Sequence, residues 1–237
     1  MTEALIQKII DSSVVDGPGN RSAIFFQGCN FNCTYCHNPE TIPMKSPTAT
    51  SMTLKEVLAV IQSNIPFIQG ITTSGGECTL QKEFLRALFR ETKKLGLTNF
   101  MDTNGSVPFT AMEELLALTD GVMLDVKAAD NSEHIKLTGA SNETVLQNLD
   151  FLASRGKLYE IRTVLVENAF DNLGTIRQVS EILKPYFGTG KIRYKLIRVR
   201  SKGVRTPYRK LRPPSEEMIV NLRDILLKAG FSEVVVV

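Results

Sequence analysis

Short apolar runs alternate with longer amphipathic stretches along most of the chain. Seven of the runs are rich in β-branched and aromatic residues, which predicts strands at residues 22–26, 70–73, 98–101, 121–126, 158–166, 191–199 and 233–237. Between most of them, apolar residues recur at helical spacing, which predicts helices at 53–63, 80–95, 110–118, 142–155, 172–184 and 215–229.

Residues at the ends of the predicted helices support their placement. Thr53 and Glu56 have the spacing of a capping box, and Thr110 and Glu113 repeat it. Gly96 follows the second predicted helix, at the position where a glycine commonly ends one.

Strands that alternate with helices predict parallel βαβ units with right-handed crossovers, and so an α/β fold class. Six or seven such units can close fully or partly into a barrel, in which chemistry lies at the C-terminal ends of the strands. No internal repeat, low-complexity tract or linker is evident, so we expect a single domain over residues 1–237.

Residue types typical of binding sites follow four successive predicted strands. Three cysteines follow the first strand, SGGE (74–77) the second and DTNG (102–105) the third. The fourth strand ends with Asp125, close to Lys127. All of these would gather at one face of a barrel, where paired carboxylates suit acid–base work or a hard cation.

Composition narrows the class of protein. The chain has 237 residues, 43% hydrophobic and 22% charged, so it can build a sizeable core without disulfides. Its formal net charge of +3 does not by itself predict a polyanionic partner. No apolar run reaches about 18 residues, so no membrane span is expected. The first residues lack a signal-peptide pattern, so we expect a cytoplasmic protein.

Three of the four cysteines stand close together in GCNFNCTYCHN, residues 28–38. Cys29, Cys33 and Cys36 have the spacing C-x3-C-x2-C, and such clusters in the cytoplasm are more often metal ligands or redox groups than disulfides. A structural zinc site needs a fourth ligand, for which His37 and Cys78 are candidates. A four-iron cluster takes one thiolate per iron and would keep one iron open. The iron–sulfur interpretation is favoured, with zinc, a redox thiol and a disulfide as alternatives.

Five motifs in a fixed order resemble a known family. They are VDGPGNR (15–21), FFQGCNFNCTYCHN (25–38), TSGGE (73–77), DTNG (102–105) and MLDVK (123–127). They resemble the radical S-adenosylmethionine (radical SAM) superfamily and, within it, the glycyl radical enzyme activating enzymes, which include the pyruvate formate-lyase activating enzymes. The resemblance implies the radical SAM fold, a partial (β/α)6-type, TIM-like barrel.

The resemblance implies one [4Fe-4S] cluster and S-adenosylmethionine (SAM) as cofactors. Cys29, Cys33 and Cys36 would hold the cluster, with SAM at the open iron. The residues implied to bind SAM are Tyr35, Ser74, Gly75, Gly76, Glu77, Asp102, Lys127, Arg162 and Arg200. From the residues alone, Tyr35 can instead be a core residue. Glu160 and Arg162 share a strand face, so Arg162 can instead form a plain ion pair.

A monovalent cation, Na+ or K+, is also implied beside the SAM carboxylate. Its implied ligands are Asp102, Thr103, Met123 and Asp125, the middle two through backbone oxygens. The segment before the first strand is implied to contact the protein substrate, through Asp16, Gly17, Pro18, Gly19 and Arg21. A plain turn or helix cap is the alternative for these residue types.

Two residues depart from the family pattern. Arg200 stands, by pattern only, where a relative has a histidine that contacts SAM. Cys78 follows Glu77 where that relative has no cysteine, and a buried small residue is the favoured interpretation. Many relatives carry a ferredoxin-like insert with further cysteines. The short stretch between Cys36 and Thr53 leaves no room for one, so a single cluster is expected.

A basic segment lies near the C-terminus. Residues 191–212 contain ten Lys or Arg and no Asp or Glu. The charges favour a docking face for an acidic electron donor such as flavodoxin or ferredoxin, or for the protein substrate. Nucleic acid is disfavoured because no aromatic platform accompanies the charges, and a solvated face remains the alternative.

By resemblance, the chain is an oxidoreductase that activates a glycyl radical enzyme. A reduced cluster would pass one electron to SAM, and the radical formed from SAM would take a hydrogen from a glycine of the partner enzyme. The alternative is a radical SAM enzyme that acts on a small molecule or nucleobase, similar to 7-carboxy-7-deazaguanine synthase. A metal-binding docking module is the non-enzyme alternative. An oxygen-labile cluster that requires anaerobic handling is expected in the favoured case.

Overall fold

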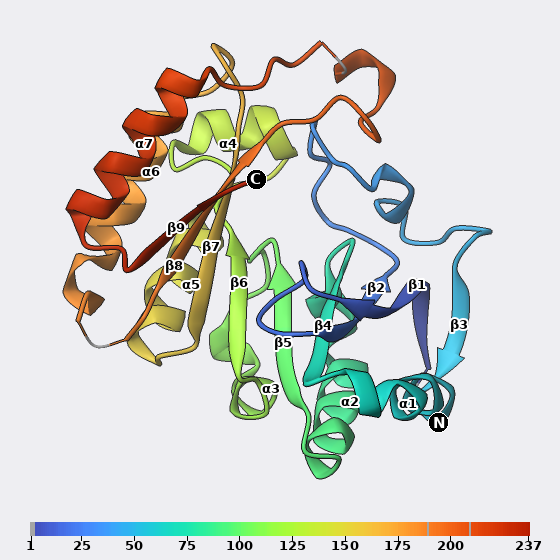
Figure 1. Ribbon diagram of the computed structural model, residues 1–237. Coiled ribbons are helices and arrows are strands. Elements are labelled where there is room, and N and C mark those ends of the chain that lie inside the picture. Colours follow the sequence, from blue (N-terminus) through green and yellow to red (C-terminus); the bar gives the residue numbers. More distant parts are fainter. Residues whose placement is uncertain (1–2, 189, 209) are drawn as a thin grey trace. The chain divides into compact units, whose positions relative to one another are not determined.

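The computed structural model describes residues 3–188, 190–208 and 210–237 (Figure 1). The chain divides into two compact units. The first unit consists of Met1–Asn30, Glu40–Thr103 and Phe109–Met123, and the second of Phe31–Pro39, Asn104–Pro108 and Leu124–Val237. The single domain expected over residues 1–237 stays a prediction.

The first unit is built on five strands in the order β3-β1-β2-β4-β5. They are β1 Glu3–Ser13, β2 Arg21–Phe26, β3 Thr50–Thr53, β4 Gly70–Gly75 and β5 Thr98–Thr103. β2, β4 and β5 are parallel, so their C-terminal ends lie at one edge, whereas β1 is antiparallel to β2 and β3. The helices are α1 Leu54–Asn64, α2 Lys82–Lys94 and α3 Glu113–Ala117, with 3-10 turns at Ile65–Phe67, Cys78–Gln81 and Phe109–Ala111.

Local hydrogen bonds decide where the helices of the first unit begin. The capping box predicted at α1 is confirmed. The Glu56 carboxylate accepts from the Thr53 backbone N–H at 2.7 Å, and the Thr53 hydroxyl accepts from the Glu56 N–H at 3.3 Å. The second predicted capping box is wrong. Thr110 lies in a 3-10 turn, and α3 begins only at Glu113.

The core of the first unit includes the inner face of α2. Phe84, Leu85, Leu88 and Phe89 are buried on this helix. The Phe84 ring meets the Phe26 ring of β2 edge-on, with centroids 6.0 Å apart. Burial of each such side chain contributes about 1.5–3 kcal/mol. This packing fixes the strands whose C-terminal ends carry the predicted site.

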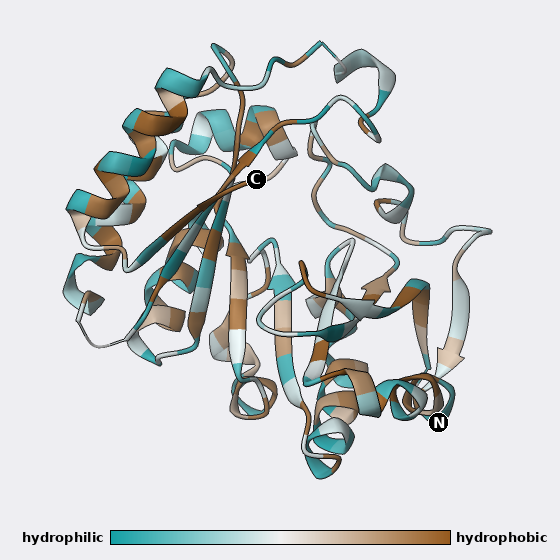
Figure 2. Cartoon of the chain, in the orientation of Figure 1, coloured by the Kyte–Doolittle hydropathy of each residue, from teal (hydrophilic) through white to brown (hydrophobic). Residues whose placement is uncertain are grey.

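The second unit contains the parallel strands β7 Leu158–Leu165, β8 Arg193–Arg198 and β9 Glu233–Val236, in that order. Its helices are α4 Asn131–Thr138, α5 Glu143–Ser154, α6 Asn172–Leu183 and α7 Glu216–Ala229, with 3-10 turns at Lys184–Tyr186 and Thr206–Tyr208. Figure 2 shows α7 with alternating hydrophobic and hydrophilic bands. Ile219, Leu222 and Leu226 form its buried stripe, in agreement with the predicted amphipathic helix.

The predicted strands and longer helices are present, with ends shifted by a few residues. The sequence did not predict β1, β3 or α4. β6, Gly121–Asp125, begins in the first unit and ends in the second. β2, β4 and β5 are parallel in the first unit and β7, β8 and β9 in the second, and helices alternate with them along the chain, which confirms the α/β class. Within the described residues, no helix has both the length and the apolar character needed to cross a membrane.

Candidate functional site

Several predicted site residues come together at the C-terminal ends of β2, β4 and β5. β2 pairs with β4, and β4 with β5, in parallel register. Cys29, the turn 74–77 and Asp102 therefore all belong to one edge of the first unit. The Ser74 hydroxyl donates to the Asp102 carboxylate at 3.0 Å, which joins two of these segments. The sequence-based expectation of a common edge holds within this unit.

The glycine turn after β4 packs directly on the segment that leads to Cys29. A Cβ on Gly75 would collide with the Phe26 backbone nitrogen, and a Cβ on Gly76 would collide with the Gly28 carbonyl oxygen. The Gly76 N–H donates to the Phe26 carbonyl at 2.9 Å. The sequence suggested close approach to a ligand as the reason for these glycines, with an ordinary turn as the alternative. Their close approach to the neighbouring backbone is a second reason.

Glu77, the last residue of this turn, and the following Cys78 are both fully buried. Oε1 of Glu77 accepts from the hydroxyls of Thr79 and Thr103 at 2.6 and 2.7 Å. Sγ of Cys78 donates to the Asp102 carbonyl at 3.6 Å. Burial, and then the nearby Glu77 charge, raise the pKa of the Cys78 thiol well above its usual range. A thiol in these surroundings is a poor nucleophile, which favours the interpretation of Cys78 as a buried small residue.

Cys33 and Cys36 lie in the second unit, on a loop that α4 holds in place. The N–H groups of Asn32 and Thr34 donate at 2.7 and 2.9 Å to the last two carbonyls of α4. The Cys36 N–H donates to the Cys33 carbonyl at 3.2 Å and closes a turn between the two residues. Burial raises the pKa of the Cys33 thiol, and the charge of Lys127 opposes part of that rise. This cation favours the thiolate form, which is the form that ligates metals.

The residue types of the cysteine motif fit an iron–sulfur cluster. Cys33 and Cys36 come from one turn, and Cys29 precedes them in the first unit. None of the four cysteines, all in the described chain, forms a disulfide. Over residues 3–188, 190–208 and 210–237, no three His, Cys, Asp or Glu side chains are already grouped as metal ligands. His37 Nε2 lies 3.3 Å from the Arg200 carbonyl oxygen. The two cysteines of the turn offer thiolate ligands, which iron–sulfur clusters use.

Tyr35, within the cysteine loop, is a core residue of the second unit. It is 3% exposed and packs with Leu137, Val166 and Val199. The ammonium of Lys127 lies 5.9 Å from the centroid of its ring. The alternative of core packing is thus confirmed for Tyr35, and its contact with SAM stays a prediction.

Asp125, the last residue of β6, forms an ion pair with Lys127, with Oδ2 and Nζ 2.8 Å apart. Burial acts to lower the pKa of Lys127. The charges of Asp125, Cys33 and Tyr35 outweigh that effect, and the pKa is raised well above its usual range. Lys127 is therefore charged at neutral pH, beside the cysteine loop of its unit.

β7 and β8 place one carboxylate among three cations. Arg162 Nε donates to Glu160 Oε1 at 2.6 Å, which confirms that these two residues share a face. β8 adds Arg193 at 2.9 Å and Lys195 at 3.6 Å from the same carboxylate. Sequence analysis missed these two cations, although their i, i+2 spacing in a predicted strand indicated a common face.

The predicted cation ligands are divided between the units. Asp102, Thr103 and Met123 belong to the first unit and Asp125 to the second. Arg200 has an exposed side chain, and its carbonyl rather than its guanidinium meets the cysteine loop. The cation site and the SAM contact of Arg200 stay predictions.

The motif at residues 16–21 lies at the other edge of the first unit. Arg21 begins β2 and pairs with Gly70, which begins β4. Its guanidinium is buried and donates to the Thr72 hydroxyl at 2.9 Å and to the Thr98 carbonyl at 2.8 Å. Arg21 therefore ties together the starts of three parallel strands, a structural role that the sequence did not reveal. Substrate contact by this motif stays a prediction.

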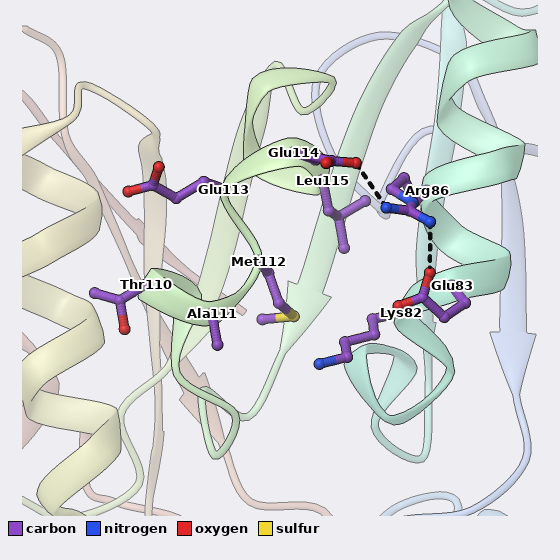
Figure 3. A pocket seen from close by; sticks show the side chains of 9 residues that line it. All are labelled: Lys82, Glu83, Arg86, Thr110, Ala111, Met112, Glu113, Glu114 and Leu115. Atoms are coloured by element: carbon purple, nitrogen blue, oxygen red, sulfur yellow. Dashed lines mark hydrogen bonds and ion pairs between the residues drawn. The ribbon is translucent and has the colours of Figure 1, made fainter.

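A cavity of about 340 Å³ opens between α2 and α3 (Figure 3). It is lined by Lys82, Glu83, Arg86, Thr110, Ala111, Met112, Glu113, Glu114 and Leu115. Arg86 bridges Glu83 at 2.8 Å and Glu114 at 2.6 Å across part of it. None of the predicted site residues lines this cavity.

Comparison with known families decides between the alternatives for the cysteine loop. The family model described as the radical SAM superfamily matches residues 23–172, which include all three clustered cysteines. The chain belongs to the radical SAM superfamily. The match extends through the glycine turn and Arg162.

Individual relatives narrow the family further. A protein of Haemophilus influenzae, whose name assigns it to glycyl-radical enzyme activation, is 34% identical over 84% of this chain and 83% of its own. The pyruvate formate-lyase-activating enzyme of Streptococcus mutans is 34% identical over 92% of this chain and 89% of its own. Within the superfamily, the chain belongs to the glycyl radical enzyme activating enzymes.

A solved structure shares the fold. A domain of pyruvate-formate lyase-activating enzyme from Bacteroides vulgatus superposes with a TM-score of 0.60 at 23% identity, over 72% of this chain and 99% of that one. The predicted radical SAM fold, a partial TIM-like barrel, is therefore confirmed.

Proposed function

We propose that this chain activates a glycyl radical enzyme by reductive cleavage of SAM. The observation that carries the proposal is the extent of the similarity. Relatives named for this activity match 84% and 92% of the chain, and the superfamily match over residues 23–172 spans the cysteine motif and the glycine turn. The geometry of the first unit supports it, because the turn 74–77 is built onto the backbone that leads to Cys29.

Membership of the superfamily implies one [4Fe-4S] cluster and SAM as cofactors. Cys29, Cys33 and Cys36 would ligate three irons and leave the fourth open to SAM. When bound, the reduced cluster supplies one electron for the cleavage of SAM, and the carbon radical released from SAM removes hydrogen from the target glycine. The chain's own task is to bind and orient SAM and to exclude water from the site.

Several polar groups of the chain would orient SAM. The turn 74–77 offers backbone groups to the SAM amino group, in keeping with its glycines. Lys127, charged beside Asp125, suits the SAM carboxylate, and Arg162 offers a second cation. The further residues that we assign to SAM are Tyr35, Asp102 and Arg200.

Two further sites belong to the proposal. A monovalent cation, Na+ or K+, would be held by Asp102, Thr103, Met123 and Asp125, because oxygen ligands suit hard cations. The substrate loop would be contacted by Asp16, Gly17, Pro18, Gly19 and Arg21. Among these, the Arg21 guanidinium is bonded within the protein to Thr72 and Thr98, and the Asp16 carboxylate accepts from the Ser13 hydroxyl.

The proposed partners are two proteins. One is the glycyl radical enzyme that receives the radical, and the other is an electron donor, flavodoxin or ferredoxin. The exposed cations among residues 191–212 would attract an acidic donor. Both partners point to a cytoplasmic setting. A radical SAM enzyme that acts on a small molecule or nucleobase is not favoured, because the named relatives activate enzymes.

The test is electron paramagnetic resonance (EPR) on anaerobically reconstituted, reduced protein, with and without SAM. We expect a four-iron signal that shifts on addition of SAM. Pyruvate formate-lyase, the substrate named for a relative, serves as the probe partner and should acquire a glycyl radical signal.

Cys33→Ala and Cys78→Ala form a matched pair for this test. Cys33→Ala should lose the cluster signal, whereas Cys78→Ala should keep it, because the Cys78 thiol is fully buried and donates to the Asp102 carbonyl. A wild-type signal that does not respond to SAM, or loss of the cluster in Cys78→Ala alone, would overturn the proposal.

A further inference from the structure

The basic segment, residues 191–212, contacts the cysteine loop of the second unit through Arg205. The guanidinium of Arg205 donates to the Asn32 side-chain oxygen at 2.6 Å, to the Asn32 carbonyl at 3.1 Å and to the Cys33 carbonyl at 2.8 Å. These contacts join residues more than 170 positions apart in sequence. All three end on the peptide groups and side chain next to one predicted cluster ligand.

The same stretch of loop is also bonded to α4. The N–H groups of Asn32 and Thr34 are bonded to the end of that helix, and the carbonyls of Asn32 and Cys33 are bonded to Arg205. The donors and acceptors of neighbouring peptide groups are thus bonded to two different elements. The backbone that carries Cys33 is therefore fixed by two separate elements.

Arg205 is itself supported by its own segment. Val204 is 1% exposed and anchors the chain beside it. The guanidinium carbon lies 5.4 Å from the centroid of the Tyr208 ring, within cation–π range. A Cβ on Gly203 would lie 2.7 Å from the His37 carbonyl, so the segment also fits closely against the residue that follows Cys36.

We propose that Arg205 is a positioning residue for the cluster-binding loop. It fixes the Asn32–Cys33 peptides and keeps a permanent positive charge beside the Cys33 ligand. Arginine suits both tasks, because its planar fork of donors matches several acceptors and it does not lose its proton in proteins. This inference rests on the proposed function, since it assumes that Cys33 ligates a cluster.

The fixed charge has a redox consequence. The potential of an iron–sulfur cluster depends on its net charge, on nearby hydrogen bonds and on solvent exposure. Reduction adds negative charge, so a nearby cation favours the reduced state. Removal of that cation should make the cluster harder to reduce.

Three variants separate the effect of the positive charge from that of the planar set of guanidinium donors. Arg205→Gln removes the charge, and Arg205→Lys keeps the charge but loses the fork. Lys202→Gln removes an exposed charge of the same segment. Each is reconstituted anaerobically and its fold is checked by circular dichroism. The readouts are the cluster reduction potential from an EPR-monitored titration without SAM, and the rate of iron release to a chelator.

We expect Arg205→Gln to shift the potential downward, and both Arg205 variants to release iron several-fold faster than wild type. Lys202→Gln should match wild type in both measurements. If Arg205→Gln folds but holds no cluster, faster iron release from Arg205→Lys would still support the positioning role. Wild-type values in Arg205→Gln and Arg205→Lys would overturn the inference. That result is distinct from failure of the proposed function, which would appear as a wild-type signal indifferent to SAM.

Discussion

Glu160 is the one acidic side chain in the charged group formed by β7 and β8. It is 2% exposed, so water contributes little to its stabilisation. Arg162 and Arg193 are partly buried around it, with 10% and 25% of their side chains exposed. The negative charge of Glu160 offsets part of the free-energy cost of removing each of these cations from water. Removal of the carboxylate should therefore cost more than the loss of one ordinary hydrogen bond.

We predict that Glu160→Gln lowers the free energy of unfolding by about 2–3 kcal/mol, because it removes the buried negative charge that Arg162, Arg193 and Lys195 share. Glu233→Gln is the matched control, since Glu233 is 57% exposed and lies 3.6 Å from Arg193. Its cost should be below about 1 kcal/mol. Denaturant unfolding of the reconstituted protein under anaerobic conditions measures both. Equal costs for the two variants would contradict this account.

Sequence alone could predict the pairing of Glu160 with Arg162, because alternation along one strand puts them on one face. It could not predict that Arg193 and Lys195 join them, since that requires the register between β7 and β8. Arg205 was beyond sequence reasoning for a similar reason. Its contact with the cysteine loop depends on how distant segments pack, and nothing in the local sequence reports that.

At the scale of elements, the turn after β4 is the most constrained part of the candidate site. Gly75 has a φ of 115° and a backbone neighbour where a side chain would begin. Gly156, after α5, has a φ of 62°, but a Cβ added there would meet no atom within 4 Å. The two glycines share a positive φ and differ in crowding, so they make a matched pair.

We predict that Gly75→Ala destabilises the protein by about 3 kcal/mol or more, as backbone strain adds to a collision with β2. Gly156→Ala should cost about 1 kcal/mol from strain alone. Thermal unfolding followed by circular dichroism, with iron content determined in parallel, measures the difference. If Gly75→Ala were no more harmful than Gly156→Ala, the close packing of the turn on β2 would be disproved.

The missed elements have identifiable causes. In β1, Leu5, Ile6, Ile9 and Ile10 recur at a spacing that fits a helix as well as a strand, so periodicity could not decide. α4 is short, and its buried face consists largely of polar residues, including His134. The longer helices carry wide apolar stripes and clear end signals, which is why the sequence predicted them.

At the scale of the whole molecule, the excess positive charge is small, with 28 Lys and Arg against 25 Asp and Glu. Within residues 191–212, several cations are already used inside the protein. Arg193 and Lys195 pair with Glu160, Arg198 pairs with Glu216, and Arg205 holds the cysteine loop. Among the described residues of this segment, the exposed cations left for a partner are Lys191, Arg200, Lys202, Lys210 and Arg212. A docking face would therefore rest on about half of the basic residues that the sequence suggested.

The exposed cations of residues 191–212 should steer an acidic electron donor to the protein. Association steered by opposite charges slows as salt rises, because the screening length is about 10 Å at 0.1 M salt. We expect reduction of the cluster by flavodoxin to slow with increasing ionic strength.

Lys202→Glu should reduce the rate several-fold at low salt and have little effect at high salt. Lys55→Glu, an exposed lysine of α1, makes the same change in net charge and should leave the rate close to wild type. Stopped-flow absorbance of the cluster measures the rate, and a photoreduced small-molecule donor should reduce all three proteins equally. Equal slowing by the two variants would mean that only the net charge matters, and the docking face would have to be sought away from the segment beside the cysteine loop.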